Sequence, residues 1–451
     1  MASTTLPAPT ADERSLLEKL LRPIADVRAG EGAVVLLLAL NLFLVLSGYY
    51  LLKTIRESLI LTESGAAVKT YSSAGQALLL LFLVPAFAAF ASRVNRVKLL
   101  TWVTLFFVSN IFLFRMFGEG RPGMGIAFFL WVGIFNVMVI SQFWAFANDL
   151  YTPEQGKRLF AVVGLGSNLG AWMGSLYARN FFKALGPYTL MMVAAGILVA
   201  CLVVAWVANR LQRRQAPPAK AAEGDEPLGR VGAFELLRKD RYLLLIGLLV
   251  IVINVVNTTG EYLLGEMAVK ASVEQFGSDP SSLDARQRFV GAFYGDFFNW
   301  VNLVGFLAQM LLVSRIMAVV GVGGALFVHP LIALTGYLAA AVSPTLGLVR
   351  SLKVLDNATD YSLNNTAKQA LWLPTSREAK YKAKQAVDSF FFRAGDVLAA
   401  GVVWLGQRLA FSVPVFAAVN AVVALVWLAI AWSLGRENRA RMAAAAQGSE
   451  S

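Results

Sequence analysis

Apolar runs of about twenty residues recur along this chain, and they constrain its fold more than any other feature. A helix that crosses a bilayer needs about 20 mostly apolar residues, and inside lipid its backbone must satisfy its own hydrogen bonds. The runs lie near residues 33–61, 76–92, 98–117, 124–148, 159–182, 188–208, 242–264, 289–316, 320–342, 345–373, 385–410 and 412–434. The pattern predicts an all-α polytopic membrane protein with about twelve transmembrane helices in the lipid bilayer.

The composition agrees with a membrane protein and explains the basic charge. Hydrophobic residues make up 57% of the chain and charged residues 15%, against about 25% charged residues in soluble domains. The formal charge of +12 raises nucleic acid as a possible partner. Lys and Arg that collect in cytoplasmic loops account for the charge more simply, so we expect no nucleic-acid partner.

The loops also predict an orientation and a division of the chain. Basic clusters such as Arg93, Arg96 and Lys98 fall in alternate loops, which places both termini in the cytoplasm, and the Ala-, Gly- and Arg-rich composition favours a bacterial inner membrane. A polar, Pro-containing stretch marks the midpoint. The expected parts are a cytoplasmic N-terminal segment (1–32), a six-helix bundle (33–208), a cytoplasmic linker (209–241), a second six-helix bundle (242–434) and a cytoplasmic tail (435–451).

Weak internal similarity suggests that the two bundles are repeats. The first run contains Gly48-Tyr-Tyr-Leu-Leu52 and the seventh contains Gly260-Glu-Tyr-Leu-Leu264. Runs four and ten each end in a tryptophan that is followed by Pro, Glu and basic residues. Duplicated six-helix halves with the substrate near the midplane are typical of major-facilitator-like transporters.

Charged residues inside the apolar runs are the first candidates for function, because burying charge in hydrocarbon is costly. In the tenth run, positions 353, 357, 360, 364 and 368 recur at helical spacing, which predicts one polar face on a wet cavity. Alternatively, these charges pair structurally, as Lys53 with Glu57 or Lys353 with Asp356. Cations in a cavity suit an anionic substrate. The candidates are Lys53, Arg56, Glu57, Glu261, Asp296, Lys353, Asp356, Asp360, Lys368 and Arg393.

Other patterns exclude several chemistries. With one cysteine, Cys201, and one histidine, His329, a metal site is not expected, and we expect no cofactor. His329 is assigned to packing rather than to a proton relay. Gly166, Gly170 and Gly174 sit four residues apart, which favours close helix packing over a phosphate-binding loop. No motif indicates an ATPase or another enzyme.

Four segments of the chain form a recognisable set, namely Tyr50-Leu-Leu-Lys-Thr-Ile-Arg-Glu57, Phe143-Trp-Ala-Phe-Ala-Asn148, Gly291-Ala-Phe-Tyr-Gly-Asp296 and Lys380-Tyr-Lys-Ala-Lys384. Together they resemble the ATP/ADP translocases of plastids and obligate intracellular bacteria. The resemblance implies exchange of ATP for ADP. It places Arg56 at a first-helix lysine of the family and Asp296 at the eighth-helix acidic residue. It also places Lys384, or its neighbour Lys382, at a lysine between helices ten and eleven. Asn257 stands in place of a seventh-helix glutamate, and Glu261 lies one turn further on.

The first hypothesis is therefore a nucleotide transporter that works by alternating access on a small anionic substrate. Lys53, Arg56 and Lys353 would neutralise phosphates, and Tyr50 or Trp144 would stack on the base. Further substrate contacts are expected from Asn257, Lys368 and Lys384. Gating or proton coupling is assigned to Glu57, Glu261, Asp296, Asp356, Asp360 and Arg393, with Asp296, Asp356 and Asp360 pairing with the cations when the site is empty.

Two alternatives remain open at this point. One keeps the scaffold for a proton-coupled transporter of another organic anion, with Glu261 or Asp296 as the proton carrier. The other is a membrane scaffold or sensor that transports nothing.

Overall fold

The computed structural model describes residues 18, 25–28, 30–91, 94–151, 153–215, 233–376 and 378–450. Most of the expected N-terminal segment (1–32) and residues 216–232 of the expected linker lie outside the described residues. The described part is helical, and no strand occurs within it. The predicted all-α class is thus confirmed.

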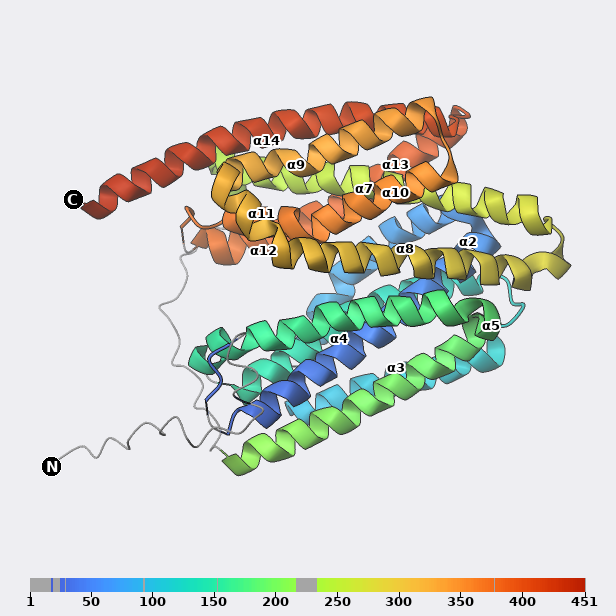
Figure 1. The fold of residues 1–451 in the computed structure, drawn as a ribbon, viewed down its shortest axis with the longest axis horizontal. Coiled ribbons are helices and arrows are strands. Elements are labelled where there is room, and N and C mark those ends of the chain that lie inside the picture. Colours follow the sequence, from blue (N-terminus) through green and yellow to red (C-terminus); the bar gives the residue numbers. More distant parts are fainter. Residues whose placement is uncertain are drawn as a thin grey trace.

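The helices form two groups that lie side by side along the long axis of the molecule (Figure 1). The first helix group consists of α2 (Gly32–Ala91), α3 (Arg96–Phe117), α4 (Met124–Leu150) and α5 (Pro153–Gln215). The second helix group consists of α6 (Ala233–Lys239), α7 (Arg241–Phe276), η1 (Pro280–Ser282), α8 (Leu283–Leu311), α9 (Val313–Val342), α10 (Leu346–Thr359), η2 (Asp360–Asn364), α11 (Asn365–Ala370), η3 (Ala379–Ala383), α12 (Lys384–Ala386), η4 (Val387–Phe391), α13 (Phe392–Arg408) and α14 (Val413–Glu450).

Seven of these helices are long and apolar enough to cross a membrane. The stretches are Gly32–Phe87, Val97–Phe117, Met124–Leu150, Arg158–Gln212, Arg241–Phe276, Val313–Val342 and Val413–Ala444. Large apolar side chains point outward from several of them, among them Phe82, Met116 and Val342, which are 77%, 72% and 87% exposed. An outer surface of this kind is suited to contact with lipid chains.

Glycines break the two longest helices. Gly65 in α2 and Gly186 in α5 have φ of +83° and +71°, a conformation that glycine adopts without a steric penalty. Lys69 forms an ion pair with Glu57 at 2.6 Å, although twelve residues of straight helix would separate them by about 18 Å. The chain therefore turns back at Gly65. Pro187 directly follows the second break, where its fixed φ favours the start of a new helix.

The first half of α2, before Gly65, is closely packed against α5. A Cβ atom on Gly166 would lie 2.2 Å from the carbonyl oxygen of Ala39, and one on Gly170 would lie 2.2 Å from that of Phe43. A Cβ atom on Gly174 would likewise lie 2.4 Å from the carbonyl oxygen of Ser47. The prediction that these three glycines serve helix packing is confirmed.

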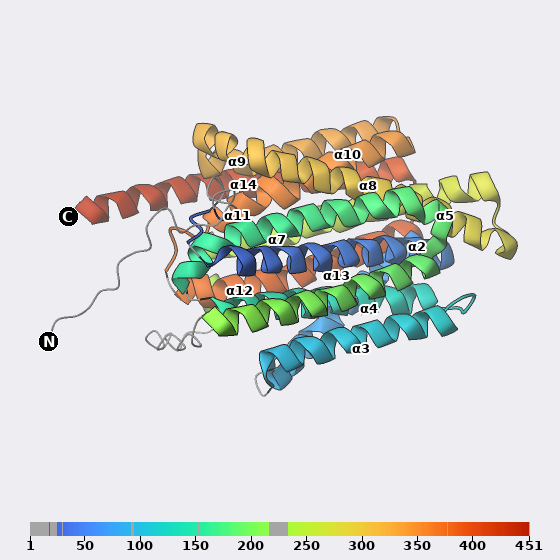
Figure 2. The ribbon, with the colours of Figure 1, turned by 60° about the horizontal axis from the view of Figure 1, so that its bottom comes forward.

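The two helix groups meet along α8, which packs on both α5 and α2 (Figure 2). A Cβ atom on Gly295 would lie 2.6 Å from the backbone nitrogen of Arg179, so the α5 and α8 backbones are nearly in contact. Asn302 of α8 donates a hydrogen bond to the hydroxyl of Ser175 at 2.9 Å. This seam forms one side of the cavity described next.

Candidate functional site between the helix groups

A polar cavity with about 1090 Å³ of empty space lies between the two helix groups. Its wall is built from α2 and α4 of the first group and from α7, α8, α10, η2 and α13 of the second. The charged residues of the lining are Lys53, Arg56, Glu57, Lys69, Glu261, Arg393 and Asp396. Five of these come from the predicted set, and Lys69 and Asp396 are additional.

Lys53 differs from the other cavity cations because no carboxylate within 4.0 Å is recorded for it among the described residues. Its ammonium group instead lies 4.3 Å from the centroid of the Phe298 ring and 5.1 Å from that of Tyr50. Cation–π contact of this kind is weaker than full charge neutralisation by a carboxylate. Lys53 is therefore available to an anion that enters the cavity.

Arg56 and Lys69 share the buried carboxylate of Glu57. Arg56 donates to Oε1 of Glu57 at 2.5 Å, and the ammonium group of Lys69 lies 2.6 Å from Oε2. The Glu57 side chain is 1% exposed. The expected Lys53–Glu57 pair is absent because Glu57 contacts these two cations instead. Arg56 also lies over the Phe129 ring, 4.5 Å from its centroid.

Glu261 contacts cavity-lining residues of both helix groups. Its Oε1 accepts a hydrogen bond from Asn357 at 3.0 Å, and its Oε2 lies 3.5 Å from the ammonium group of Lys69. Asn357 and Glu261 belong to the second group, whereas Lys69 belongs to the first. The charges of the cavity are thus connected across its width.

The third carboxylate of the cavity lining, Asp396, contacts neutral donors and one cation of the second group. Asp396 Oδ1 accepts hydrogen bonds from Asn254 at 2.9 Å and from Thr258 at 3.2 Å, and its Oδ2 lies 3.5 Å from Arg393. Aromatic side chains complete the lining, namely Tyr49, Phe129, Phe298, Tyr361 and Phe392. The cavity therefore offers cations, neutral hydrogen-bonding groups and ring faces together.

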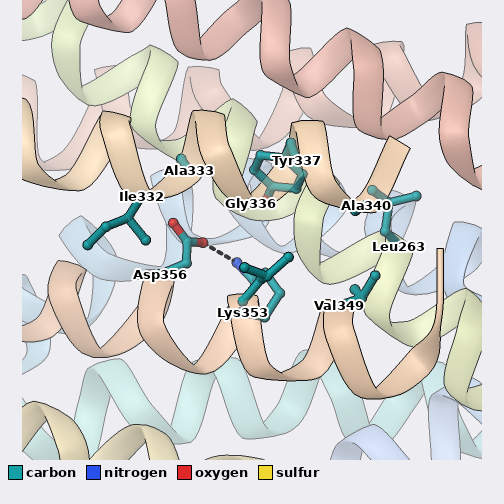
Figure 3. A pocket seen from close by; sticks show the side chains of 10 residues that line it. Leu263, Ile332, Ala333, Gly336, Tyr337, Ala340, Val349, Lys353 and Asp356 are labelled. Carbon is teal, nitrogen blue, oxygen red and sulfur yellow. Dashed lines mark hydrogen bonds and ion pairs between the residues drawn. The ribbon is translucent and has the colours of Figure 1, made fainter. Parts of the chain in front are cut away.

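Lys353 and Asp356 lie behind the cavity wall rather than in its lining. Lys353 is 2% exposed and forms an ion pair with Asp356 at 2.6 Å beside an apolar pocket between α7, α9 and α10 (Figure 3). Its ammonium group also donates to the side-chain oxygen of Asn257, which does line the cavity, at 2.9 Å. Its ammonium group also lies 3.9 Å from Oε1 of Glu261, another lining residue, so in this conformation Lys353 can influence a ligand through Asn257 and Glu261.

Asp360 and Lys368 form a second, partly buried ion pair next to this one, and His329 lies between the two pairs. Nε2 of His329 lies 2.8 Å from Asp356, and Lys368 lies 3.3 Å from Asp360. The two networks are adjacent, since Nδ1 of His329 is 3.9 Å from Asp360. The charged residues Lys353, Asp356, Asp360 and Lys368 of the tenth run therefore pair with one another. The prediction that this run presents one polar face to the cavity is wrong.

The remaining predicted residues lie elsewhere. Asp296 contacts Arg179 of α5 at 3.0 Å and also pairs with Arg350 of α10, away from the cavity cations. Tyr50 is buried beside Phe298, 6.0 Å between ring centroids. Trp144 packs on Phe143 and Phe160, and Lys384 pairs with the adjacent Asp388 at 2.7 Å. None of these four predicted residues is in the cavity lining.

Lys69 is the cavity cation that the sequence interpretation missed. It falls outside both of the expected runs 33–61 and 76–92, whereas the helix restarts directly after Gly65. The signal that could have located it is the Gly65 turn followed by a helical run. In the part of the chain that the structure describes, no group of three or more His, Cys, Asp or Glu side chains could hold a metal ion.

Comparisons with known proteins agree with this architecture. The family model described as TLC ATP/ADP transporter matches residues 126–438. "ADP,ATP carrier protein 1" of Chlamydia muridarum is 25% identical over 67% of this chain, and the match spans 62% of the length of that relative. "ADP,ATP carrier protein 1" of Rickettsia bellii is 21% identical, and the match covers 95% of this chain and 98% of that protein.

Solved transporters have the same fold at low sequence identity. The crystal structure of the nucleoside transporter NupG is 12% identical with a TM-score of 0.62, and it covers 91% of this chain and 99% of its own. The chain therefore shares the fold of this solved transporter, and it is a multi-pass membrane protein. Since the family model covers more than half of the sequence, the chain belongs to the TLC ATP/ADP transporter family.

Proposed function

We propose that this protein exchanges adenine nucleotides across a membrane by alternating access. The observation that carries the proposal is Lys53, a cation without an ion-pair partner among the described residues, in a cavity between the two helix groups that it shares with Arg56 and Lys69. Arg and Lys side chains form the strongest contacts with phosphate groups. The relatives named as ADP,ATP carriers support the nucleotide as the substrate.

Each part of the cavity has a role in this proposal. Lys53, Arg56 and Lys69 bind the phosphates, and aromatic residues such as Phe298 and Tyr361 contact the base. Asn257, held by Lys353, provides a polar contact from the second group. The other predicted substrate residues, Tyr50, Trp144, Lys368 and Lys384, would act only in a conformation that brings them to the cavity.

The predicted gating residues are assigned by their contacts. Asp296 holds Arg179 of the first group beside Arg350 of the second, so it stabilises the seam between the groups. Asp356 and Asp360 keep Lys353 and Lys368 neutralised behind the wall. Glu57, Glu261 and Arg393 respond directly to a ligand because they line the cavity.

The proposal includes twelve membrane spans in two six-helix bundles. Two of the seven candidate spans divide at Gly65 and Gly186. Three further helical stretches, α8, α10–α11 and η3–α13, supply the remaining spans. The proposal keeps the expected bundles at 33–208 and 242–434, the linker 209–241 and the tail 435–451, although α5 continues to Gln215 and α14 to Glu450.

We place the protein in the bacterial inner membrane with both ends in the cytoplasm. The start of α2 and the end of α14 lie at the same end of the molecule, as an even number of spans requires (Figure 1). The excess of Lys and Arg in the alternate loops supports the cytoplasmic side.

Thermal unfolding of the purified protein tests nucleotide binding. ADP or ATP at about 100 times its dissociation constant should stabilise the protein by about 2.7 kcal/mol. Adenosine, which lacks phosphates, should stabilise it much less, and Lys53→Gln should weaken the effect of ADP. Equal melting temperatures with and without nucleotides would contradict the proposal.

A further inference from the structure

Lys69 occupies a position between carboxylates of the two helix groups. It belongs to the second part of α2, after the turn at Gly65, and its side chain is 8% exposed. Its ammonium group lies 2.6 Å from Glu57 of its own group and 3.5 Å from Glu261 of the other. The longer contact is therefore also the one that joins the groups.

Two ion pairs connect the helix groups within the described ranges. One is Arg179–Asp296, whose residues are outside the cavity lining. The other is Lys69–Glu261, and both of its residues line the cavity. A ligand in the cavity can thus reach only the second of these pairs.

The two contacts of Lys69 differ in how easily an anion can replace them. Glu57 is 1% exposed, is fixed on its other oxygen by Arg56 and is the closer partner. Glu261 is 19% exposed and faces Lys69 from the opposite wall. A phosphate that enters between Lys53 and Lys69 would compete with Glu261 rather than with Glu57.

We propose that Lys69 makes movement of the two helix groups depend on bound nucleotide. In the empty cavity, Lys69 is paired with Glu261, and this pair holds the groups together. A phosphate group takes the place of the Glu261 carboxylate on Lys69 and releases the contact between the groups. This inference rests on the proposed nucleotide exchange and assigns Lys69 as a coupling residue in it.

The proposal gives a physical reason for strict exchange. A ligand shifts a conformational equilibrium only by the difference in its interactions with the two states. Here the difference arises because a largely buried ion pair is costly to separate unless another anion replaces one partner. After a carrier releases its nucleotide, the Lys69–Glu261 pair forms again. The two helix groups then keep their conformation until the next nucleotide binds.

The test uses Glu261→Gln in reconstituted full-length protein. Glutamine keeps a side-chain oxygen for the hydrogen bond from Asn357 but removes the charge opposite Lys69. Proteoliposomes are loaded with labelled ADP, and efflux is measured into nucleotide-free buffer and into buffer with ATP. Wild-type efflux should require external ATP. In Glu261→Gln, efflux into nucleotide-free buffer should rise by about tenfold and approach the rate with ATP.

Glu266→Gln is the matched control, because Glu266 is an exposed carboxylate on the same helix, α7, and is outside the cavity lining. Efflux of labelled ADP from vesicles with Glu266→Gln should still require external ATP. If Glu261→Gln is not recovered as a folded protein, Glu261→Asp replaces it. Aspartate keeps the charge but shortens the reach to Lys69, and it should give a smaller rise in nucleotide-free efflux.

Efflux that still requires ATP in Glu261→Gln would overturn the role of Lys69, and so would loss of efflux under both conditions. Neither result would affect nucleotide exchange by the wild type. By contrast, a wild-type protein that shows no ATP-dependent efflux would contradict the proposed function itself.

Discussion

The ammonium group of Lys53 lies 4.3 Å from the centroid of the Phe298 ring, so a cation of the first helix group rests on an aromatic ring of the second. This contact orients Lys53 in the cavity without neutralising it by a carboxylate. The positive charge of Lys53 therefore remains available to bind an anionic substrate.

Replacing Lys53 by glutamine should reduce nucleotide exchange without loss of the fold. A contact to a charged group contributes about 1.5–3 kcal/mol, so kcat/KM for exchange should fall by about 10- to 100-fold. The melting temperature should change little, because no ion pair of Lys53 is recorded within the described residues. Transport kinetics in proteoliposomes provide the measurement. Lys98→Gln, at an exposed position outside the cavity lining, is the control, and equal kcat/KM values for the two variants would argue against the role of Lys53.

Gly166→Ala should destabilise the contact between α2 and α5. The new Cβ atom would lie 2.2 Å from the carbonyl oxygen of Ala39, and overpacking of this kind costs about 1–3 kcal/mol. Gly164→Ala is the matched control on the same helix, since a Cβ atom there meets nothing within 4 Å. Thermal unfolding should show a lower melting temperature for Gly166→Ala alone. The packing interpretation fails if both variants melt at the same temperature.

Asp356→Ala should destabilise the protein more than removal of the whole ion pair. Alanine leaves Lys353 without its 2.6 Å partner and His329 without its 2.8 Å partner, and an uncompensated buried charge costs about 3–5 kcal/mol. The double variant Lys353→Met/Asp356→Leu removes the charge together with its partner, so it should melt at a higher temperature than Asp356→Ala. A double variant that is equally unstable or less stable would contradict this account of the buried pair.

Glu31, which directly precedes α2, should make stability depend on acid pH. Burial raises the pKa of Glu31, but hydrogen bonds from Arg158, the backbone N–H of Arg28 and the side chain of Gln155 outweigh it and hold the pKa below the ordinary value of 4.5. A carboxyl group with a lowered folded pKa contributes stability that is fully present above the unfolded pKa and is lost as the pH falls through the folded pKa.

The difference in melting temperature between the wild type and Glu31→Gln should therefore be largest above about pH 5 and should shrink below pH 4.5. Glu119→Gln is the control, because the Glu119 side chain is 69% exposed and lies 3.5 Å from its partner Arg115. A difference that stays constant between pH 4 and pH 7 would rule out a contribution from the ionised Glu31.

The fold class could be predicted from the sequence because apolar runs report directly on burial in lipid or protein. The helix ends could not be predicted as well. The expected runs 33–61 and 76–92 left a gap between them, whereas the chain turns at Gly65 and is helical on both sides of it. A polar stretch that faces a cavity has low hydropathy and therefore looks like a loop. Lys69 was missed for this reason.

Part of the candidate site could be predicted from the position of charges within apolar runs. Lys53, Arg56, Glu57, Glu261 and Arg393 were predicted as site residues in this way, and the structure places all five in the cavity lining.

Spacing was less informative in the tenth run. A regular α-helix was assumed there, but η2 is a π-helical turn with more residues per turn, which rotates the later side chains. Asn357 reaches the cavity, whereas Lys368 pairs with Asp360 outside its lining.

Uptake of labelled ATP into proteoliposomes is the decisive test of nucleotide exchange. One set of vesicles is preloaded with ADP, and the other contains no nucleotide. ATP uptake should be rapid only into the ADP-loaded vesicles and should be reduced in Lys53→Gln. If folded, reconstituted wild-type protein takes up no ATP into either set, or takes it up equally into both, the protein is not a nucleotide exchanger.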